Sequence, residues 1–561
     1  MTGTRATEGR VVILGGGVAG MSAAQELAER GFEVVVLERM DIAGGKARSM
    51  PVPRSGTDGR PDLPGEHGFR FFPAFYRHLP DTMRRIPFKR QPGGVLDNLV
   101  EATHIEIAQV GRRDVVVPAV FPTSPRDVGL VLRATLRNLV AGEPGLTTAD
   151  IAYFTERLLT LLGSCRARRE HEFEYQKWWT FSGAVHRSRA YQLFLADGLT
   201  RCLVAARAEE ISARTAGFTL LQLLFGMAVP WGRTDRLLNG PTNEVWINPW
   251  LDHLRRLGVD YRFHTHVEAI HCEGTRIREV VATQDGVTAP VTGDHFISAL
   301  PVEVMSGLVT EEMKAAEPRL SRLDRLRTRW MTGVMYYLGD DIPLVRGHAL
   351  YIDTPWALTS ISQHQFWDGT YLRSRGNGDV SGILSVDVSD WNTPGEKHRR
   401  PARECSEAEI KEEVWHQLAR RVPELNDARV VRCFIDSDIR WRKEADHPVN
   451  LEPLLINTPG SWDARPKATL RIENLFLASD YVRTHTNLAT MEGANEAARR
   501  AVNGILEVSG SREERCGVWP LREPDVFAPL RFLDSMRYRR RLPARPAAGI
   551  ELEEEAAADL R

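Results

Sequence analysis

The chain has 561 residues, too many for a single simple hydrophobic core, so we expect two or more intertwined domains. Hydrophobic residues make up 42% and charged residues 26%, which is typical of an ordinary soluble globular protein. A formal net charge of −1 excludes a global basic field, so no nucleic acid partner is expected. Six scattered cysteines without a CxxC pair argue against a disulfide framework and a zinc site, and suit a reducing cytoplasm.

We expect no segment that spans a membrane. The N-terminal MTGTRATEGR has no apolar signal core. The most apolar run, residues 219–231, is too short to cross a bilayer and contains Gln222. These features predict a cytoplasmic protein.

A nucleotide-binding unit is predicted at the start of the chain. Residues 11–14, VVIL, are typical of a buried parallel strand; GGGVAG and a helical stretch follow, and a second strand, EVVVLE, ends at Glu38. This order is the dinucleotide fingerprint of a βαβ unit. Gly15 permits the tight turn, Gly17 lets a pyrophosphate approach the backbone, and Gly20 lets the helix pack close to the strand. Glu38 can accept hydrogen bonds from a ribose diol.

The loop after this unit, RMDIAGGKARSM, offers a second set of phosphate contacts. Its glycine pair is flexible and its basic side chains are cationic, so both can approach a pyrophosphate. The candidate cofactor-binding residues of this loop are Arg39, Gly44, Gly45, Lys46 and Arg48.

The stretch GEHGFRFFPAFYRHL, which begins at residue 65, crowds aromatic residues among charged ones. We interpret it as part of the wall of a reaction site. His67 can move protons near neutral pH and is a candidate catalytic residue. Arg70 is a second candidate, because a cation there can stabilise the negative charge of a reduced cofactor ring or pair with a substrate carboxylate. A structural pairing of Arg70 with Glu66 or another carboxylate is the open alternative.

The middle of the chain is expected to build a substrate domain. Residues 127–140 read as an amphipathic helix, either a domain's outer face, which we favour, or a membrane-surface element. The aromatic residues of 171–181 form either core or the wall of an apolar tunnel. From about residue 330 to 465 the pattern becomes strand-like and predicts a sheet on the far side of a cavity.

Near the far end, residues 475–478 read as a buried strand with Asp480 after it, and a helix is expected from about residue 488. Met491 and Glu492 fall in or near the first turn of that helix. Backbone N–H groups there can face a ring that gains negative charge on reduction.

These motifs together resemble the FAD-dependent amine oxidase and phytoene desaturase superfamily, most strongly its carotenoid desaturase and hydroxysqualene dehydroxylase branch. GGKAR is similar to the second glycine motif of that family, and SD followed by MEGA is similar to its C-terminal flavin motif. Three positions depart from the pattern: Ser479 replaces a glycine, Arg70 replaces a histidine, and Pro73 with Ala74 replaces a glycine.

The resemblance implies an α/β fold of the GR2 type, with a Rossmann-type FAD-binding domain and a mixed α+β substrate domain. The FAD domain is expected to be discontinuous, built from 1–95, 240–310 and 470–510. The substrate domain then comprises 96–239 and 311–469, and 511–561 is a partly flexible extension.

Particular cofactor contacts also follow from the resemblance. Asp480 is expected at the ribityl–pyrophosphate part of FAD, and Met491 and Glu492 along the pyrimidine edge of the flavin. The backbone at Val267 is expected to meet the adenine. The segment beside the flavin supplies further candidate cofactor-binding residues, namely Gly68, Phe69 and Arg70.

The implied reaction is transfer of hydride from a substrate carbon to FAD. One hypothesis is a desaturase or dehydrogenase of an apolar, isoprenoid-like small molecule. Another is an oxidase of amines or amino acids, and a third is a redox-neutral FAD isomerase or a non-catalytic FAD protein. A basic, partly apolar segment at 531–541 is either a solvated tail, which we favour, or a contact with anionic lipid. The substrate, the electron acceptor and the oligomeric state stay open.

Overall fold

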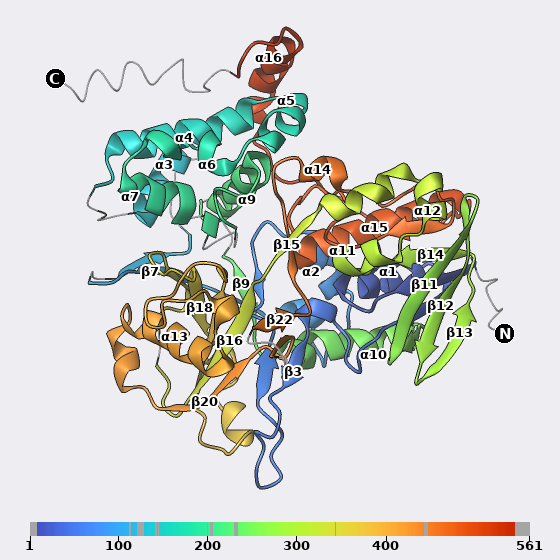
Figure 1. The fold of residues 1–561 in the computed structure, drawn as a ribbon, viewed down its shortest axis with the longest axis horizontal. Helices are drawn as coiled ribbons and strands as arrows, with labels where there is room; N and C mark the ends of the chain where they lie inside the picture. The colour runs from blue at the N-terminus through green and yellow to red at the C-terminus, as the bar shows by residue number, and fades with distance from the viewer. Residues whose placement is uncertain are drawn as a thin grey trace.

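The computed structural model describes residues 8–111, 114–120, 128–140, 143, 145–198, 200–201, 206–228, 234–342, 344–441 and 447–544. Figure 1 shows one lobe on the right around a parallel sheet, a second lobe at the lower left around a larger sheet, and a group of helices at the upper left. Residues 545–561 of the predicted C-terminal extension lie outside the described part of the chain.

The first sheet has five parallel strands in the order β10-β2-β1-β14-β24. Their bounds are Asp260–Arg262, Glu33–Leu37, Arg10–Leu14, His295–Ser298 and Leu475–Leu477. β1 and β2 are runs of Val, Ile and Leu, which suit strands buried on both faces. Helices α1 (Val18–Ala28) and α15 (Met491–Val508) pack against each other over this sheet (Figure 1). The sheet therefore brings residues 10–37 and 475–508 to one place and confirms the predicted Rossmann-type α/β fold.

An antiparallel sheet of three strands lies at the outer edge of this lobe (Figure 1). It comprises β11 (Thr265–Glu273), β12 (Arg276–Gln284) and β13 (Val287–Val291). The turn between β11 and β12 includes Gly274, whose positive φ of 59° glycine adopts without strain.

The second large sheet has seven strands in the order β20-β16-β19-β18-β17-β7-β8. Their bounds are Val430–Ile435, Thr332–Leu338, Gly382–Val388, Leu358–Ser362, Gly347–Tyr351, His104–Ala108 and Val115–Pro118. Neighbouring strands are antiparallel except β17 and β7. Helix α13 (Glu407–Ala419) covers one face through an apolar core that includes Val334, Tyr336 and Val386. The opposite face of the seven-stranded sheet contacts other parts of the chain.

The upper-left helices have an apolar core of their own. Their main members are α3 (Val128–Leu139), α4 (Thr148–Gly163), α6 (Trp178–Phe181) and α9 (Ala213–Gly226). Trp178 and Phe181 are buried in that core, and the indole N–H of Trp178 donates to the carbonyl of Ala196 at 2.9 Å. Trp178 and Phe181 are thus core, Tyr175 is exposed, and no aromatic residue of 171–181 lines the cavity described below.

Helix α3 buries Val131, Leu132 and Leu136 against these helices and turns Arg137 to solvent, as expected for the outer face of a domain. Residue 127 of this predicted helix lies outside the described residues. Among the helices that the structure describes, none has the length and apolar character needed to cross a bilayer.

Candidate active site

A cavity of about 460 Å³ opens between the carboxyl ends of the parallel strands, the face of the seven-stranded sheet opposite α13, and helix α9. Open α/β sheets bind ligands at this edge. Almost every residue that the sequence singled out lines it: His67, Arg70, Gly15, Gly17, Glu38, Arg39, Gly44, Gly45, Lys46, Arg48, Gly68, Phe69, Val267, Asp480 and Met491.

The two glycine loops meet at one side of the cavity. Gly17 and Gly44 form an isolated parallel bridge. A Cβ on Gly45 would lie 2.9 Å from the Cα of Gly17, and Gly45 has a φ of 53°. Since neither loop has room for side chains, backbone faces the cavity here, together with the N-terminus of α1, whose first turn carries no acidic residue. This is a cradle for a pyrophosphate.

Gly20 does not line the cavity, but it allows this arrangement. A Cβ there would lie 2.0 Å from the carbonyl oxygen of Gly15. The helix can therefore approach the strand only with glycine at this position, which is the packing role that the fingerprint predicts.

Glu38 ends β2 and stays buried. The backbone N–H groups of Gly16 and Met40 donate to its carboxylate at 2.8 and 2.9 Å. Burial raises its pKa in spite of these bonds. Because Glu38 also lines the cavity, the carboxylate is held rigidly where a ribose diol can reach it.

The basic residues of the second loop are not free cations. Lys46 pairs with Glu303 at 2.9 Å, Arg48 with Asp438 at 2.5 Å, and Arg39 with Glu452 at 2.7 Å. These acids come from distant parts of the chain, so the sequence could not reveal the pairs. The sequence predicted a flexible loop with free cations, but ion pairs fix this loop. The loop's backbone and glycines remain closest to the cavity.

The N-terminus of α15 faces the cavity through Met491, and Asp480 lines it just beyond β24. Glu492 does not line it. The N–H groups of Arg77, His78 and Leu79 donate to the Glu492 carboxylate at 2.7, 2.8 and 2.9 Å. The Glu492 side chain instead caps helix α2 (His78–Arg84), so the backbone of the stretch, and not this carboxylate, is left to meet the expected flavin.

Arg70 lines the cavity but forms none of the carboxylate pairs considered from the sequence. Its guanidinium donates to the carbonyls of Lys46 and Ala47 at 2.8 and 3.1 Å. Burial lowers its pKa, although Glu66 and other nearby acids oppose this. Arg70 therefore braces the second glycine loop against the aromatic stretch.

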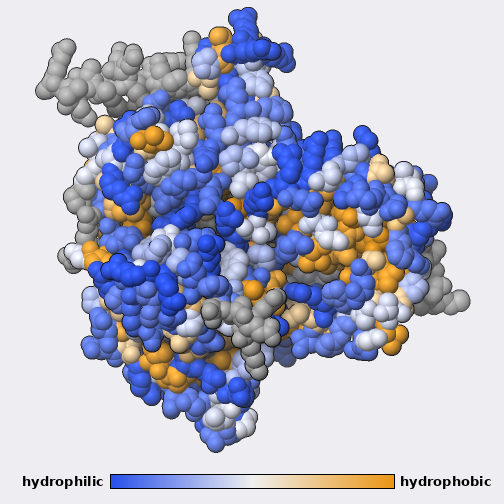
Figure 2. All heavy atoms as spheres, viewed as in Figure 1, coloured by the Kyte–Doolittle hydropathy of each residue, from blue (hydrophilic) through white to orange (hydrophobic). Residues whose placement is uncertain are grey.

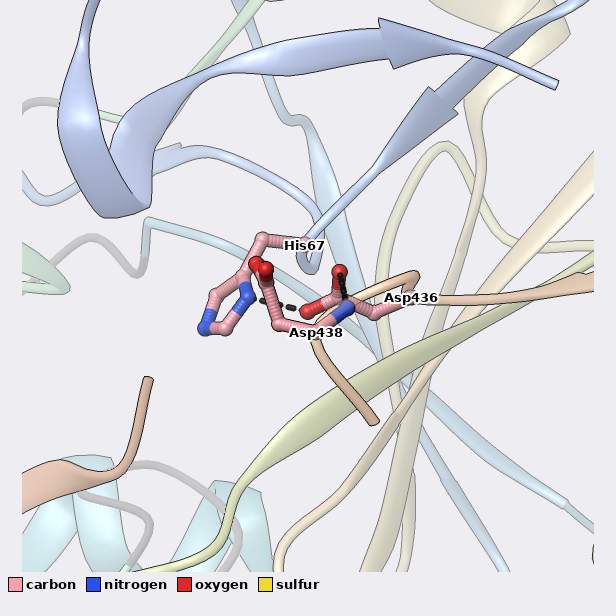
Figure 3. A group of neighbouring side chains, drawn as sticks. All are labelled: His67, Asp436 and Asp438. Carbon is pink, nitrogen blue, oxygen red and sulfur yellow. Dashed lines mark hydrogen bonds and ion pairs between the residues drawn. The ribbon is translucent and has the colours of Figure 1, made fainter. Parts of the chain in front are cut away.

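His67 sits beside two buried carboxylates (Figure 3). Its Nδ1 faces an oxygen of Asp436 in a close ion pair, and Asp438 lies next to both. The three ligand atoms lie within 4.8 Å of one another, a spacing that a cation could use. Arg48 already supplies positive charge by pairing with Asp438, so we interpret the group as an acid that orients a histidine.

Sequence reasoning missed two side chains on the seven-stranded sheet that line the cavity, Asp387 on β19 and His348 on β17. Burial raises the pKa of Asp387 to about 7 and lowers the pKa of His348 to about 4. The only sequence signal was the alternation in GILSVDV, which places Ser385 and Asp387 on one face of a strand.

Comparison with known proteins agrees with this geometry. The family described as flavin containing amine oxidoreductase matches residues 18–506, so the chain belongs to that family. The chain is 22% identical over 505 residues to a 15-cis-phytoene desaturase from an Oncidium hybrid cultivar, covering 89% of this chain and 78% of the desaturase. It is 24% identical over 529 residues to a zeta-carotene desaturase from Synechocystis, covering 89% and 97%.

Solved structures share the fold. Cyclohexylamine oxidase from Brevibacterium oxydans superposes with a TM-score of 0.58 at 14% identity, covering 90% of this chain and 100% of that one. Putrescine oxidase bound to putrescine gives 0.57 at 14% identity, covering 89% and 99%. The protein is an FAD-dependent oxidoreductase. The glycine cradle, Glu38 and the α15 N-terminus are the residues that would hold FAD, and FAD bound there would supply a hydride acceptor.

Proposed function

We propose that this enzyme is a desaturase or dehydrogenase that removes hydride from a carbon of an apolar, isoprenoid-like substrate. The observation that carries the proposal is the aromatic wall formed by Phe69, Phe71, Phe75 and Tyr76 beside the cofactor cradle. Side chains of this kind bury large apolar area with few rotamers.

Other lining residues support the same substrate. Leu223 of α9 and Ile211 extend the apolar surface on the helical side of the cavity. Arg70 also lines this space, although its guanidinium donates to the carbonyls of Lys46 and Ala47, so a protonated amine would meet a like charge there. This disfavours the amine oxidase hypothesis without affecting a hydrocarbon.

The protein's own groups would then position the substrate and accept a proton. His67 lines the cavity, and Asp436 holds its Nδ1. A histidine fixed in this way presents Nε2 as a base. We assign proton removal to His67, with Asp436 as its positioning residue.

Anaerobic mixing tests the proposal. Phytoene and zeta-carotene in detergent are added to the FAD-loaded enzyme, in parallel with putrescine and cyclohexylamine, and the visible absorbance of the oxidised flavin is followed. We expect bleaching by a carotenoid precursor and not by the amines. Bleaching by an amine alone would contradict the proposal.

For localisation, we propose contact with an anionic membrane surface through α16 (Ala528–Arg539). Phe532, Leu533 and Met536 are exposed on this helix, and Arg539–Arg541 follow them at its end. Its one acid, Asp534, points inward and pairs with Arg168 at 3.0 Å. Figure 2 shows hydrophobic and strongly hydrophilic residues side by side at this end of the molecule. An outward face that combines apolar and basic groups suits anionic lipid.

A further inference from the structure

The cavity reaches solvent at two separate places. Among the described residues that line it, four are exposed: Arg39, His266, Arg329 and Asn392. The first two belong together, because they adjoin Glu38 and Thr265, and the Thr265 N–H donates to the carbonyl of Glu38 at 2.8 Å. The other two also belong together, because the rings of their neighbours Trp330 and Trp391 are in contact, with centroids 5.2 Å apart.

The two openings differ in what surrounds them. The first opening lies beside Glu38 and Val267, where the ribose and adenine of FAD are expected, so FAD bound there would fill it. The second opening, at Arg329 and Asn392, lies away from the residues that would hold FAD. We call it the far opening. In the part of the chain that the structure describes, it is the way into the cavity that a bound cofactor would leave free.

Charged side chains line the far opening. Arg329, at the end of β15 (Arg327–Arg329), pairs with Glu210 at 3.0 Å. Arg207 pairs with Asp390, just after β19, at 2.7 Å. All four residues line the cavity. The two ion pairs join the segment 206–211 to two other parts of the chain, so an apolar molecule that enters here must pass between paired charges.

The backbone of this segment is fixed. The carbonyl of Ala208 accepts a hydrogen bond from the Trp179 N–H at 2.8 Å, and the carbonyl of Ile211 accepts one from the Trp178 N–H at 3.0 Å. Both tryptophans belong to helix α6, and Trp178 is buried in the core of the helices. Passage through the far opening therefore requires movement of side chains and not of the segment that carries them.

The side chains at the far opening can move at small cost. Arg329 and Glu210 are 46% and 30% exposed, and ion pairs between exposed side chains contribute little to stability. Asp390 is buried, but it also pairs with Arg201 at 2.6 Å. When the Arg207 side chain turns to solvent, Asp390 keeps this second partner, so no buried charge is left alone.

We propose that the far opening is the portal through which the apolar substrate enters, and that the Arg207 and Glu210 side chains gate it. In the closed state each side chain holds its ion pair across the opening. In the open state both turn to water, and the substrate passes over the fixed backbone into the apolar part of the cavity. This inference rests on the proposed function, because only an apolar substrate is hindered by paired charges.

A saturated hydrocarbon tests the gate without turnover. Phytane in detergent is mixed rapidly with the FAD-loaded enzyme, and the perturbation of the flavin spectrum gives the association and dissociation rate constants. In the double variant Arg207→Gln with Glu210→Gln, both rate constants should rise about fivefold, the effect of two exposed ion pairs. The dissociation constant should stay unchanged, because a gate changes the path and not the bound state. A changed dissociation constant with an unchanged association rate would make these residues a binding site and overturn the portal.

Salt and bulk test the gate from opposite directions. Added NaCl should speed the entry of phytane into the wild type and not into the double variant, since salt screens exposed ion pairs. Asn392→Trp should slow association and dissociation together, because it places a large side chain at the opening. The control is Arg276→Gln with Glu473→Gln, which removes an exposed ion pair outside the cavity lining and should change neither rate. Rates that respond to the control pair as strongly as to Arg207 and Glu210 would contradict the portal.

The outcomes separate this inference from the proposed function. If carotenoid precursors bleach the flavin and the variants at the far opening leave both phytane rates unchanged, the portal fails and the apolar substrate stands. If amines bleach the flavin and phytane does not bind, the proposed function fails and the portal fails with it.

Discussion

The five-stranded and the seven-stranded sheets border the same cavity, but they present different kinds of groups to it. The parallel sheet meets it with backbone: glycines at two loop turns, the N-terminus of a helix, and an acid whose own bonds come from N–H groups. The seven-stranded sheet meets it with side chains, and several of their polar atoms have no hydrogen-bond partner in the described residues. A cofactor site made of backbone tolerates little change in shape, whereas a substrate site made of side chains can change its chemistry residue by residue.

The largest effect is expected where helix α1 approaches its strand. Gly20→Val should destabilise the fold by about 3 kcal/mol and abolish FAD retention, since even a Cβ would lie 2.0 Å from the Gly15 carbonyl. Thermal unfolding and the flavin content of purified protein measure this. Gly307→Ala in α11 (Val302–Leu308) is the matched control, because nothing lies within 4 Å of its Cβ. Normal FAD retention in the Gly20 variant would contradict the view that the backbone-built cofactor site tolerates little change in shape.

The next effect concerns a carboxylate that is structural and not cofactor-binding. Glu492→Gln should cost about 2 kcal/mol, because bonds to a buried charged acceptor are lost. Burial raises the pKa of Glu492, but hydrogen bonds from His78 and from the backbone outweigh it and lower the pKa overall. Its stabilisation is therefore present above the unfolded pKa near 4.5 and is lost as pH falls through the folded value.

Urea unfolding of both proteins at several pH values checks this. The gap between wild type and the Gln variant should shrink below pH 4.5, the ordinary pKa of Glu492. Glu507→Gln, an exposed change on the same helix, should have no effect at any pH. A gap that stays constant down to acid pH would show that the carboxylate charge is unimportant.

A smaller effect on stability is expected on the seven-stranded sheet, where a substitution should stabilise the protein instead of destabilising it. The pKa of Asp387 is raised to about 7 by burial, with Arg70 and His67 opposing the rise and Glu66 adding to it. The unfolded carboxyl ionises near its ordinary pKa of 3.8 while the folded one stays protonated, so the wild type loses stability from about pH 4 to pH 7. Asp387→Asn should therefore be more stable than wild type at pH 8 by on the order of 1–2 kcal/mol, and not at pH 4.

Melting temperatures across this pH range test the sign. An Asn variant that is less stable than wild type at pH 8 would mean that the folded protein stabilises the ionised Asp387 carboxylate and does not raise its pKa. The group around it would then be a charged site and not a neutral one.

The smallest effect on stability is expected on α16, remote from both sheets. Phe532→Ser with Leu533→Ser should leave the melting temperature unchanged, because these side chains are 66% and 49% exposed. Sedimentation with anionic vesicles should show about tenfold weaker binding. Val287→Ser, at a 68% exposed position on β13, is the control. Unchanged vesicle binding in the double variant would remove α16 as the contact.

Much of the cofactor side could be predicted from the sequence. The glycine fingerprint, Glu38 and the MEGA helix depend on contacts within short segments, so their spacing carries the geometry. Spacing gave no sign of the role of the Glu492 carboxylate, whose bonds reach residues more than 400 positions away in the sequence. It also could not see that Lys46 and Arg48 are neutralised by distant acids.

By itself the sequence determined the FAD fold and predicted the glycine loops, the helix start and the aromatic segment that line the cavity, because turns, helix starts and strand ends are local properties of the backbone. Only the tertiary structure decided which side chains face the substrate. Asp387 and Asp436 lie near His67 through the register of paired strands and through loop contacts across the molecule. Register is a property of the assembled sheet, set by the packing of both faces, and no spacing along one strand encodes its partner.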